Sequence, residues 1–344
     1  MKLSIVILNW NGEQMLRQFL PSVTASCANM PEVEVCVADN ASTDESVSLV
    51  RSQFPTVRII RLDRNYGFAG GYNRAIKQVD STYTLLLNSD VEVPTDWLPP
   101  LLDYMDTHPE TAACQPKILS YSQRGIFEHA GAAGGFIDRY GYPFCRGRVM
   151  DRVEADHGQY DEPSGHHPVF WATGAALLVR TADYLAVGGL DEQFFAHMEE
   201  IDLCWRLLSR GRQIVCITDS RVWHVGGATL SSAHPRKTYL NFRNSLLMLY
   251  KNVPTSAELF RVMSVRSILD AVACLRFAVT GQWSHARAVI SAVRDFHRLR
   301  PTYASVREEL RRTATCPHPA GRFRWCLIWQ YYILRRRTFS ELKR

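Results

Sequence analysis

The stretch Tyr83–Pro94 (YTLLLNSDVEVP) decides how this chain of 344 residues folds. An apolar run, Leu85–Leu87, is followed at once by the acids Asp90 and Glu92. Such a run is typical of a strand buried on both faces, and this strand would deliver its carboxylates to the edge of a sheet. Carboxylates in that position suit a hard divalent cation, which in turn suits a phosphate. A strand that simply ends in a polar turn is the alternative.

The residues before this stretch alternate between strand and helix patterns. Apolar runs predict strands at 3–8, 33–38 and 57–62, and helical spacing predicts helices at 13–27, 44–53 and 72–79. This rhythm favours a mostly parallel α/β sheet covered by helices on both faces. Ligands bind such sheets at the carboxyl ends of the strands. Asn9, Asn11, Asp39, Asp90 and Glu92 should therefore converge at one edge.

A second acidic cluster lies beyond a buried strand predicted at 169–180. Glu199, Glu200 and Asp202 open a helix there, where the helix dipole alone would favour acids. Glu199 and Glu200 are adjacent and point about 100° apart, so that one can face a cleft. His224 follows a strand predicted at 212–218, ahead of a glycine pair. Residues 121–168 show little periodicity, which is typical of a functional loop or a lid.

Composition places the chain among cytoplasmic globular proteins. The N-terminus lacks the features of a signal peptide, and no apolar run reaches the roughly 18–20 residues that span a bilayer. The nine cysteines form no Cys-x-x-Cys pair, which favours reduced thiols over disulfides or a zinc site. Charge is uneven: residues 1–233 have 19 Lys and Arg against 28 Asp and Glu, whereas residues 234–344 have 21 against 6.

This asymmetry divides the chain into an acidic body, 1–233, and a basic C-terminal region, 234–344. Helices are predicted in that region at 239–251, 256–279, 283–299, 301–313 and 323–337. The last combines aromatic and aliphatic residues with Arg335–Arg337, as in helices that lie on the anionic inner face of the cytoplasmic membrane. Packing on the body or on a second subunit, as in a homodimer, is the competing interpretation. Nucleic acid is not expected, because no recognised binding motif accompanies the charge.

Six motifs in order resemble those of one enzyme family. They are SIVILNWN (4–11), VADNASTD (37–44), NYGFAGGYN (65–73), LLNSD (86–90), GGLDEQFF (188–195) and EEIDLC (199–204). Together they resemble the family-2 inverting glycosyltransferases, and in particular the bacterial rhamnosyltransferase-like branch, over roughly residues 1–250. The resemblance implies a Rossmann-like sheet of the GT-A type with a C-terminal helical extension.

The resemblance also implies a nucleotide-diphosphate sugar as donor, a dTDP- or UDP-sugar. Asn9, Asn11 and Asp39 match positions that line the nucleoside, and Asn65 and Gly67 match the turn beside it. Rhamnose is the sugar that the branch suggests, although relatives with similar motifs use other donors. The acceptor would be a hydroxyl of a glycan or lipid-linked glycan in cell-surface polysaccharide synthesis.

The remaining matches concern the metal and the base. Asp90 matches the metal-binding end of an Asp-x-Asp-like motif, Glu92 is a further member, and His224 matches a residue that completes a Mg²⁺ or Mn²⁺ site in many relatives. Glu200 matches the catalytic base, more often an Asp. Glu199 and Asp202 match neighbouring acids that orient the base or bind acceptor.

Two other functions remain open at this point. A nucleotidyltransferase also places acids at strand ends, but would normally show a glycine-rich basic signature near the N-terminus, and residues 9–12 (NWNG) contain no Lys or Arg. A non-catalytic sugar-nucleotide-binding protein is the other alternative. Retention of Asp90, Glu200 and His224 counts against it.

Overall fold

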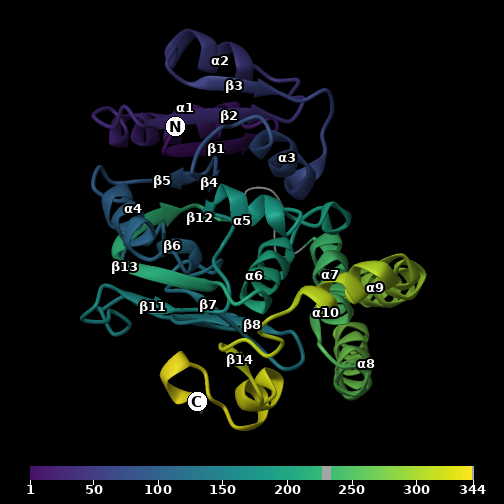
Figure 1. Cartoon of the computed structure of the whole chain (residues 1–344). Coiled ribbons are helices and arrows are strands. Elements are labelled where there is room, and N and C mark those ends of the chain that lie inside the picture. Colours follow the sequence, from purple (N-terminus) through teal and green to yellow (C-terminus); the bar gives the residue numbers. More distant parts are fainter. Residues whose placement is uncertain (227–233, 343–344) are drawn as a thin grey trace.

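A large mixed sheet forms the centre of the computed structural model, which describes residues 1–226 and 234–342. In spatial order its strands are β3 (Arg58–Arg61), β2 (Val33–Asp39), β1 (Leu3–Asn9), β4 (Tyr83–Asn88), β12 (Ala176–Arg180), β6 (Thr111–Ser120), β13 (Gln213–His224) and β11 (His166–Pro168), with β5 (Val91–Glu92) paired to β13. Figure 1 shows this sheet crossing the molecule from β3 to β11.

The expected α/β sheet is confirmed, but it is parallel only in part. β1, β2, β3 and β4 pair in parallel, as do β6 and β13. β12 is antiparallel to both of its neighbours, β4 and β6, and β5 and β11 are antiparallel to β13. The regular strand–helix rhythm that predicts parallel pairing ends at β4, and beyond it the chain adds strands in both directions.

Helices cover both faces of the sheet. They are α1 (Glu13–Ser26), α2 (Ser46–Gln53), α3 (Gly67–Ile76), α4 (Leu98–Thr107), α5 (Thr181–Ala186) and α6 (Glu199–Ser209). The pleat of β4 divides the core, because Leu85 and Leu87 belong to one apolar cluster and Leu86 to the other. Trp97 is buried in the first cluster and Trp205 in the second. A strand buried on both faces was the expectation for this stretch, and it is confirmed.

Residues 121–168, which sequence periodicity did not assign, contribute most of a second, smaller sheet. Its strands are β10 (Arg152–Val153), β9 (Arg148–Val149), β8 (Pro143–Cys145), β7 (Gly135–Asp138) and β14 (Arg322–Phe323), in that order. These strands are two to four residues long, too short for a period of two to emerge from the sequence.

The helix predicted at 323–337 is wrong. Its first residue ends β14, the Phe323 and Trp325 rings lie 4.9 Å apart against Phe144, and only Trp329–Ile333 forms a short π-helical turn. Trp329 and Tyr332 are 56% and 46% exposed, whereas Phe323 and Trp325 pack this segment on the small sheet. The competing interpretation, packing on the body, holds for these last two side chains.

Four helices form the rest of the C-terminal region: α7 (Pro235–Asn252), α8 (Ser256–Val279), α9 (Trp283–Leu299) and α10 (Ala304–Thr313). Single 3₁₀ turns lie at Glu192–Phe194, Arg300–Tyr303 and Phe339–Glu341. α7 packs against α6 and α9, and α8 and α9 project beside the body (Figure 1). Within the described chain, every helix is too short or too polar to cross a bilayer. The predicted domain boundary at residue 233 lies outside the described residues.

Candidate active site

The ends of β1 and β2 place the first predicted residues side by side. Asn9 and Asp39 are register partners, and both are buried. Asn9 Nδ2 donates to Ser42 Oγ at 3.1 Å, and the Ser42 amide lies 3.3 Å from Asp39 Oδ2. Asn11 Oδ1 accepts a hydrogen bond from the Thr43 amide at 2.8 Å. Asn9 Oδ1 is buried without a partner, an acceptor that a bound molecule could satisfy.

The glycine-rich turn ahead of α3 is held beside these strand ends. Asn65 Oδ1 accepts from the Gly67 amide at 2.8 Å and from Asn40 Nδ2 at 3.1 Å. Gly67 has φ of 72°, and a Cβ there would come within 2.6 Å of the Phe195 ring. Glycine is needed here both for the backbone conformation and for the approach of Phe195. Asn65 and Gly67 thus shape a turn that lies between the ends of β1 and β2 and Phe195, a few residues before Glu199.

Asp90 and His224 meet because β13 extends further than predicted and ends at His224. β5 pairs with this end of β13, with Val91 opposite His224. His224 Nε2 lies 3.1 Å from Asp90 Oδ1, and His224 Nδ1 lies 3.2 Å from Glu128 Oε2. Burial opposes a charge on the imidazole, but the two carboxylates outweigh it and raise the pKa of His224 to about 10.

Glu92 does not join this pair, which corrects the prediction that it is a third metal residue. Because successive strand residues face opposite sides, Glu92 of β5 points away from the side of Val91. Its carboxylate lies 2.6 Å from Arg124 Nη2 in a surface ion pair.

The Asp90–His224 pair would fit a divalent cation that the ligand completes, provided that the cation displaces the proton of the His224 imidazole. A carboxylate oxygen and an imidazole nitrogen face each other, and Glu128 holds the other ring nitrogen, as carboxylates do behind metal-binding histidines. Among residues 1–226 and 234–342, no three His, Cys, Asp or Glu side chains are arranged to hold a metal by themselves. Mg²⁺ is commonly held by one or two protein side chains together with substrate phosphates.

Glu199 and Glu200 lie at the first turn of α6, as predicted. One carboxylate oxygen of each, Oε2, is buried and has no hydrogen-bond partner. Burial raises the pKa of Glu200 to about 7. Burial, followed by the adjacent charge of Glu200, raises the pKa of Glu199 well above its usual value. Unsatisfied buried carboxylates with raised pKa values are typical of groups that exchange protons with a ligand.

Asp202 does not share this environment, so its predicted role beside the base or acceptor is corrected. It lies two residues after Glu200, about 200° around the helix. Its carboxylate is fully buried and lies 2.9 Å from both Arg206 Nε and Lys251 Nζ, and it accepts from Asn252 Nδ2 at 2.8 Å. Asp202 therefore ties α6 to α7, and its side chain is fully buried among these partners.

The segment that leads into α6 adopts a backbone that L-residues rarely take. Phe195, His197 and Met198 have φ values of 66°, 71° and 71°. Each such residue costs roughly 1–2 kcal/mol, and this strain is characteristic of functional sites. The conformation of this segment sets the direction in which Glu199 and Glu200 leave it.

Asn244 of α7 holds the strained segment in place. Its Nδ2 lies 3.0 Å from the carbonyl oxygen of Phe194, 2.9 Å from that of Ala196 and 2.8 Å from that of His197. Arg243 Nη2 donates to the Asn244 Oδ1 at 2.8 Å and to the Phe194 carbonyl oxygen at 3.2 Å. We call this arrangement the Asn244 clamp.

Residues 173–175 connect the two acidic regions. The Asn88 amide at the end of β4 donates to the Ala175 carbonyl at 3.0 Å, and Asn88 Nδ2 lies 3.3 Å from His224 Nε2. On its other side, a Cβ on Gly174 would lie 3.9 Å from Glu200 Cβ. The strand predicted at 169–180 begins only at Ala176, because the residues before it form this connection. Both the Asp90–His224 pair, through Asn88, and Glu200 thus lie near this short segment.

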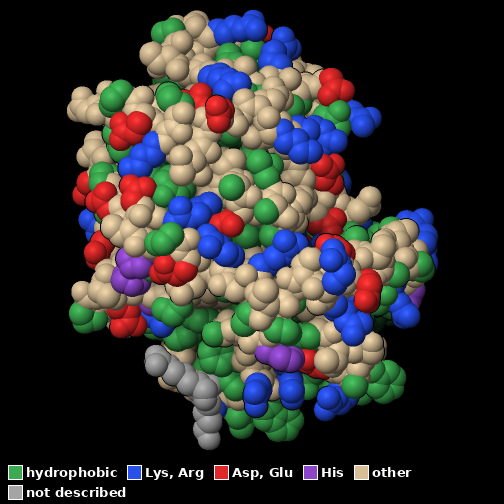
Figure 2. Space-filling model, viewed as in Figure 1, with side chains coloured by type: hydrophobic (Ala, Val, Ile, Leu, Met, Phe, Trp, Pro, Cys, Tyr) green, Lys and Arg blue, Asp and Glu red, His purple; other side chains and the backbone are tan. Residues whose placement is uncertain are grey.

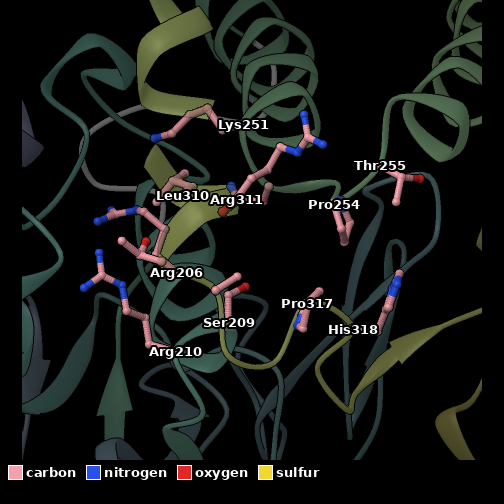
Figure 3. A pocket seen from close by; sticks show the side chains of 13 residues that line it. Arg206, Ser209, Arg210, Lys251, Pro254, Thr255, Leu310, Arg311, Pro317 and His318 are labelled. Atoms are coloured by element: carbon pink, nitrogen blue, oxygen red, sulfur yellow. The ribbon is translucent and has the colours of Figure 1, made fainter. Parts of the chain in front are cut away.

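A hollow of about 330 Å³ lies on a different face of α6 (Figure 3). Its lining includes Arg206, Ser209, Arg210 and Lys251, and Figure 3 shows the charged ends of Arg206, Arg210 and Lys251 pointing away from the space. Ser209 lies nine residues after Glu200, half a turn out of phase on the helix. This hollow is therefore separate from the candidate active site.

The sequence did not point to Glu128, and it did not show what Asn244 contacts. Glu128 lies in the stretch that showed no periodicity, and its pairing with His224 crosses 96 positions of the chain. Asn244 and its neighbour resemble a pair common in the family, but no spacing rule connects it to a loop 48 residues earlier.

Comparison with known proteins agrees with this geometry. The family model "Glycosyl transferase family 2" matches residues 4–159. N-acetylglucosaminyl-diphospho-decaprenol L-rhamnosyltransferase of Mycobacterium tuberculosis is 29% identical over 259 residues, which cover 69% of this chain and 83% of that protein. The O-antigen biosynthesis protein RfbC of Myxococcus xanthus is 27% identical over 248 residues, 69% of this chain but 18% of that protein.

Solved structures share the fold. S. aureus TarS 1–349 in complex with UDP-GlcNAc matches with a TM-score of 0.57 and 18% identity, covering 91% of this chain and 90% of that one. GalNAc-T7 with UDP, GalNAc and Mn²⁺ matches with a TM-score of 0.58 and 15% identity, covering 74% and 48%. Family, relatives and fold agree, which leaves no support for a nucleotidyltransferase or a non-catalytic protein. Residues 4–159 are thus similar to family-2 glycosyltransferases, and 69% of the chain is similar to a bacterial rhamnosyltransferase.

Proposed function

We propose that the enzyme moves a sugar, with inversion, from a nucleotide-diphosphate donor to a hydroxyl of a glycan or lipid-linked glycan in cell-surface polysaccharide synthesis. The observation that carries the proposal is that two unlike groups both lie close to residues 173–175. A cation-binding pair, Asp90 and His224, lies beside Asn88, and a buried carboxylate with a raised pKa, Glu200, lies beside Gly174. The first suits a diphosphate and the second suits a proton acceptor.

Each residue has a role in this proposal. Asn9, Asn11 and Asp39 bind the nucleoside at the ends of β1 and β2. Asp90 and His224 hold Mg²⁺ or Mn²⁺, which when bound neutralises the charge of the diphosphate leaving group. Glu128 orients the His224 ring.

Glu200 takes the proton from the acceptor hydroxyl as the hydroxyl attacks the sugar. Its raised pKa makes the carboxylate a stronger base than an exposed Glu while leaving it largely ionised above pH 7. A single displacement inverts the anomeric carbon and needs no second carboxylate as nucleophile. Glu199 is buried beside Glu200, and the repulsion between two carboxylates makes it unfavourable for both to be ionised at once.

Rhamnose is the sugar we propose, with dTDP- or UDP-linked donors, because the M. tuberculosis relative is described as a rhamnosyltransferase. A panel of nucleotide sugars, incubated with the enzyme and Mn²⁺ or Mg²⁺, tests donor use through metal-dependent release of nucleoside diphosphate. Mass spectrometry of the products identifies the sugar, and the anomeric coupling in NMR spectra reports the stereochemistry. Release of nucleoside diphosphate from none of the donors, or a retained anomer, contradicts the proposal.

A further inference from the structure

One side of α8 presents an apolar stripe without a partner in the described chain. Phe260, Ile268, Val272, Leu275 and Val279 are between 60% and 74% exposed. At 100° per residue they fall within about 120° of the helix circumference. The residues on the opposite side, including Val262 and the buried Arg266–Asp270 ion pair, pack on the body. The exposed stripe is therefore not needed to hold α8 in place.

The stripe continues onto two neighbouring segments. Trp283, at the tip of the connection to α9, is 62% exposed. Arg276 of α8 reaches the Tyr332 hydroxyl at 3.3 Å, and Tyr332 belongs to a turn whose side chains Trp329 and Ile333 are also exposed. We call the α8 stripe, Trp283 and this turn the apolar face. Figure 2 shows hydrophobic side chains gathered over α8, at the lower right of the molecule.

Arg side chains border the apolar face along α8 and α9 of the described chain. Residues 256–299 contain six Arg and three acids, and all three acids are engaged. Glu258 pairs with Arg322 at 2.8 Å, Asp270 pairs with Arg266 at 3.2 Å, and Asp295 accepts from the Tyr239 hydroxyl at 2.8 Å. Arg261, by helical position, lies within the stripe and Arg276 at its border, and both are exposed.

We infer that the apolar face rests on an anionic lipid surface. Exposed aliphatic side chains, an exposed Trp at one end and bordering Arg are the chemistry that enters the interfacial region of such a surface. A second copy of the chain fits less well, because a two-fold contact would bring two faces with Arg261 and Arg276 together, and the acids of residues 256–299 are already paired. An apolar groove of about 830 Å³ between α7, α8 and α9, lined by Phe260 and Leu275 among others, adjoins the face and would receive acyl chains.

This inference rests on the proposed function, because an enzyme with a lipid-linked acceptor would meet that acceptor at a membrane. It also changes which part of the chain is expected to contact the membrane. The sequence placed this contact on 323–337, whose aromatic side chains Phe323 and Trp325 instead pack on the small sheet. α8 supplies most of the surface.

Co-sedimentation with vesicles tests the inference on the full chain. Vesicles of 30% phosphatidylglycerol in phosphatidylcholine should bind the protein at least tenfold more tightly than pure phosphatidylcholine, and added salt should weaken the binding. The double variant Ile268→Asp/Leu275→Asp should lose at least tenfold in affinity. Leu185→Asp, which changes a residue 46% exposed on α5, is the matched control and should bind like wild type.

Two results would overturn the inference: equal vesicle binding by the double variant and wild type, or no binding by the wild type. Sedimentation velocity tests the alternative occupant, a second copy of the chain. If wild type forms a dimer but does not bind vesicles, and the double variant is a monomer, the apolar face is a subunit contact and the inference is overturned. Donor hydrolysis measured on the same proteins keeps the two proposals apart. It should be unchanged in the double variant, and its absence from wild type would count against the proposed function alone.

Discussion

Replacing Asn244 with Ala should slow sugar transfer far more than it weakens donor binding. The Asn244 amide has two N–H donors, which the carbonyl oxygens of residues 194, 196 and 197 share, and together these contacts contribute about 2 kcal/mol. The three left-handed residues of that segment cost about 1–2 kcal/mol each. Because this strain is at least as large as the stabilisation that the clamp provides, loss of the clamp frees the segment to relax and carries Glu199 and Glu200 out of position.

We expect kcat to fall about 100-fold, since a displacement of about 1 Å at a reacting group costs that much. The donor KM should change less than threefold, because Asn244 holds residues 194–197 and, within the described chain, makes no contact with Asp90 or His224, the proposed donor-binding pair. The free energy of unfolding should fall by about 1–3 kcal/mol, because the carbonyl groups of Ala196 and His197 lose their donor whereas that of Phe194 keeps Arg243. Hydrogen exchange should accelerate at residues 195–201.

Leu101→Ala is the matched control for stability. Leu101 is fully buried in α4, and its truncation costs about 2–5 kcal/mol at a distance from the clamp. This variant should keep its kcat and its slow exchange at 195–201. If Asn244→Ala is destabilised to the same extent yet keeps kcat within threefold of wild type, the clamp does not position the acids and the reasoning is refuted.

Asp90→Asn should abolish the increase in donor affinity that Mn²⁺ produces in calorimetry, whereas a variant that still responds to Mn²⁺ would exclude Asp90 as a ligand. Glu128→Gln should weaken Mn²⁺ binding about 10- to 100-fold through loss of the His224 orientation, and Glu92→Gln, whose residue pairs with Arg124 instead, should not. kcat/KM should rise as the pH increases through about 7, because Glu200 must lose its proton to act as a base; a profile flat from pH 6 to 8 would contradict this. The folded-state pKa of Glu200 lies above its unfolded value, so wild type loses stability as the pH rises through about 7, and thermal unfolding should find Glu200→Gln the more stable protein at pH 8.

The N-terminal half of the fold was predictable because its pattern is local. Strands buried on both faces and the helices between them leave periodic signals, and β1, β2 and β4 bring Asn9, Asp39 and Asp90 to one edge as expected. The long helices α8 and α9 were predicted to the residue for the same reason.

What could not be predicted depends on contacts between distant segments. The small sheet is made of strands of two to four residues, and β14 joins it from the C-terminal end of the chain. The environments of neighbouring acids could not be predicted either. Asp202 and Glu200 share a motif, yet Asp202 pairs with Lys251 and Arg206, whereas Glu200 Oε2 has no partner in the described chain. Tertiary packing decides which residues become ion-pair partners, and a short sequence motif contains no information about that packing.

The transfer rate of Glu200→Gln, measured in a single turnover with saturating donor and Mn²⁺, tests the account most directly. Glutamine keeps the shape of the side chain but cannot accept the hydroxyl proton. We predict a rate lower by about 10²- to 10⁴-fold, with donor affinity in calorimetry unchanged within threefold. A variant that transfers sugar within tenfold of the wild-type rate would show that Glu200 is not the base.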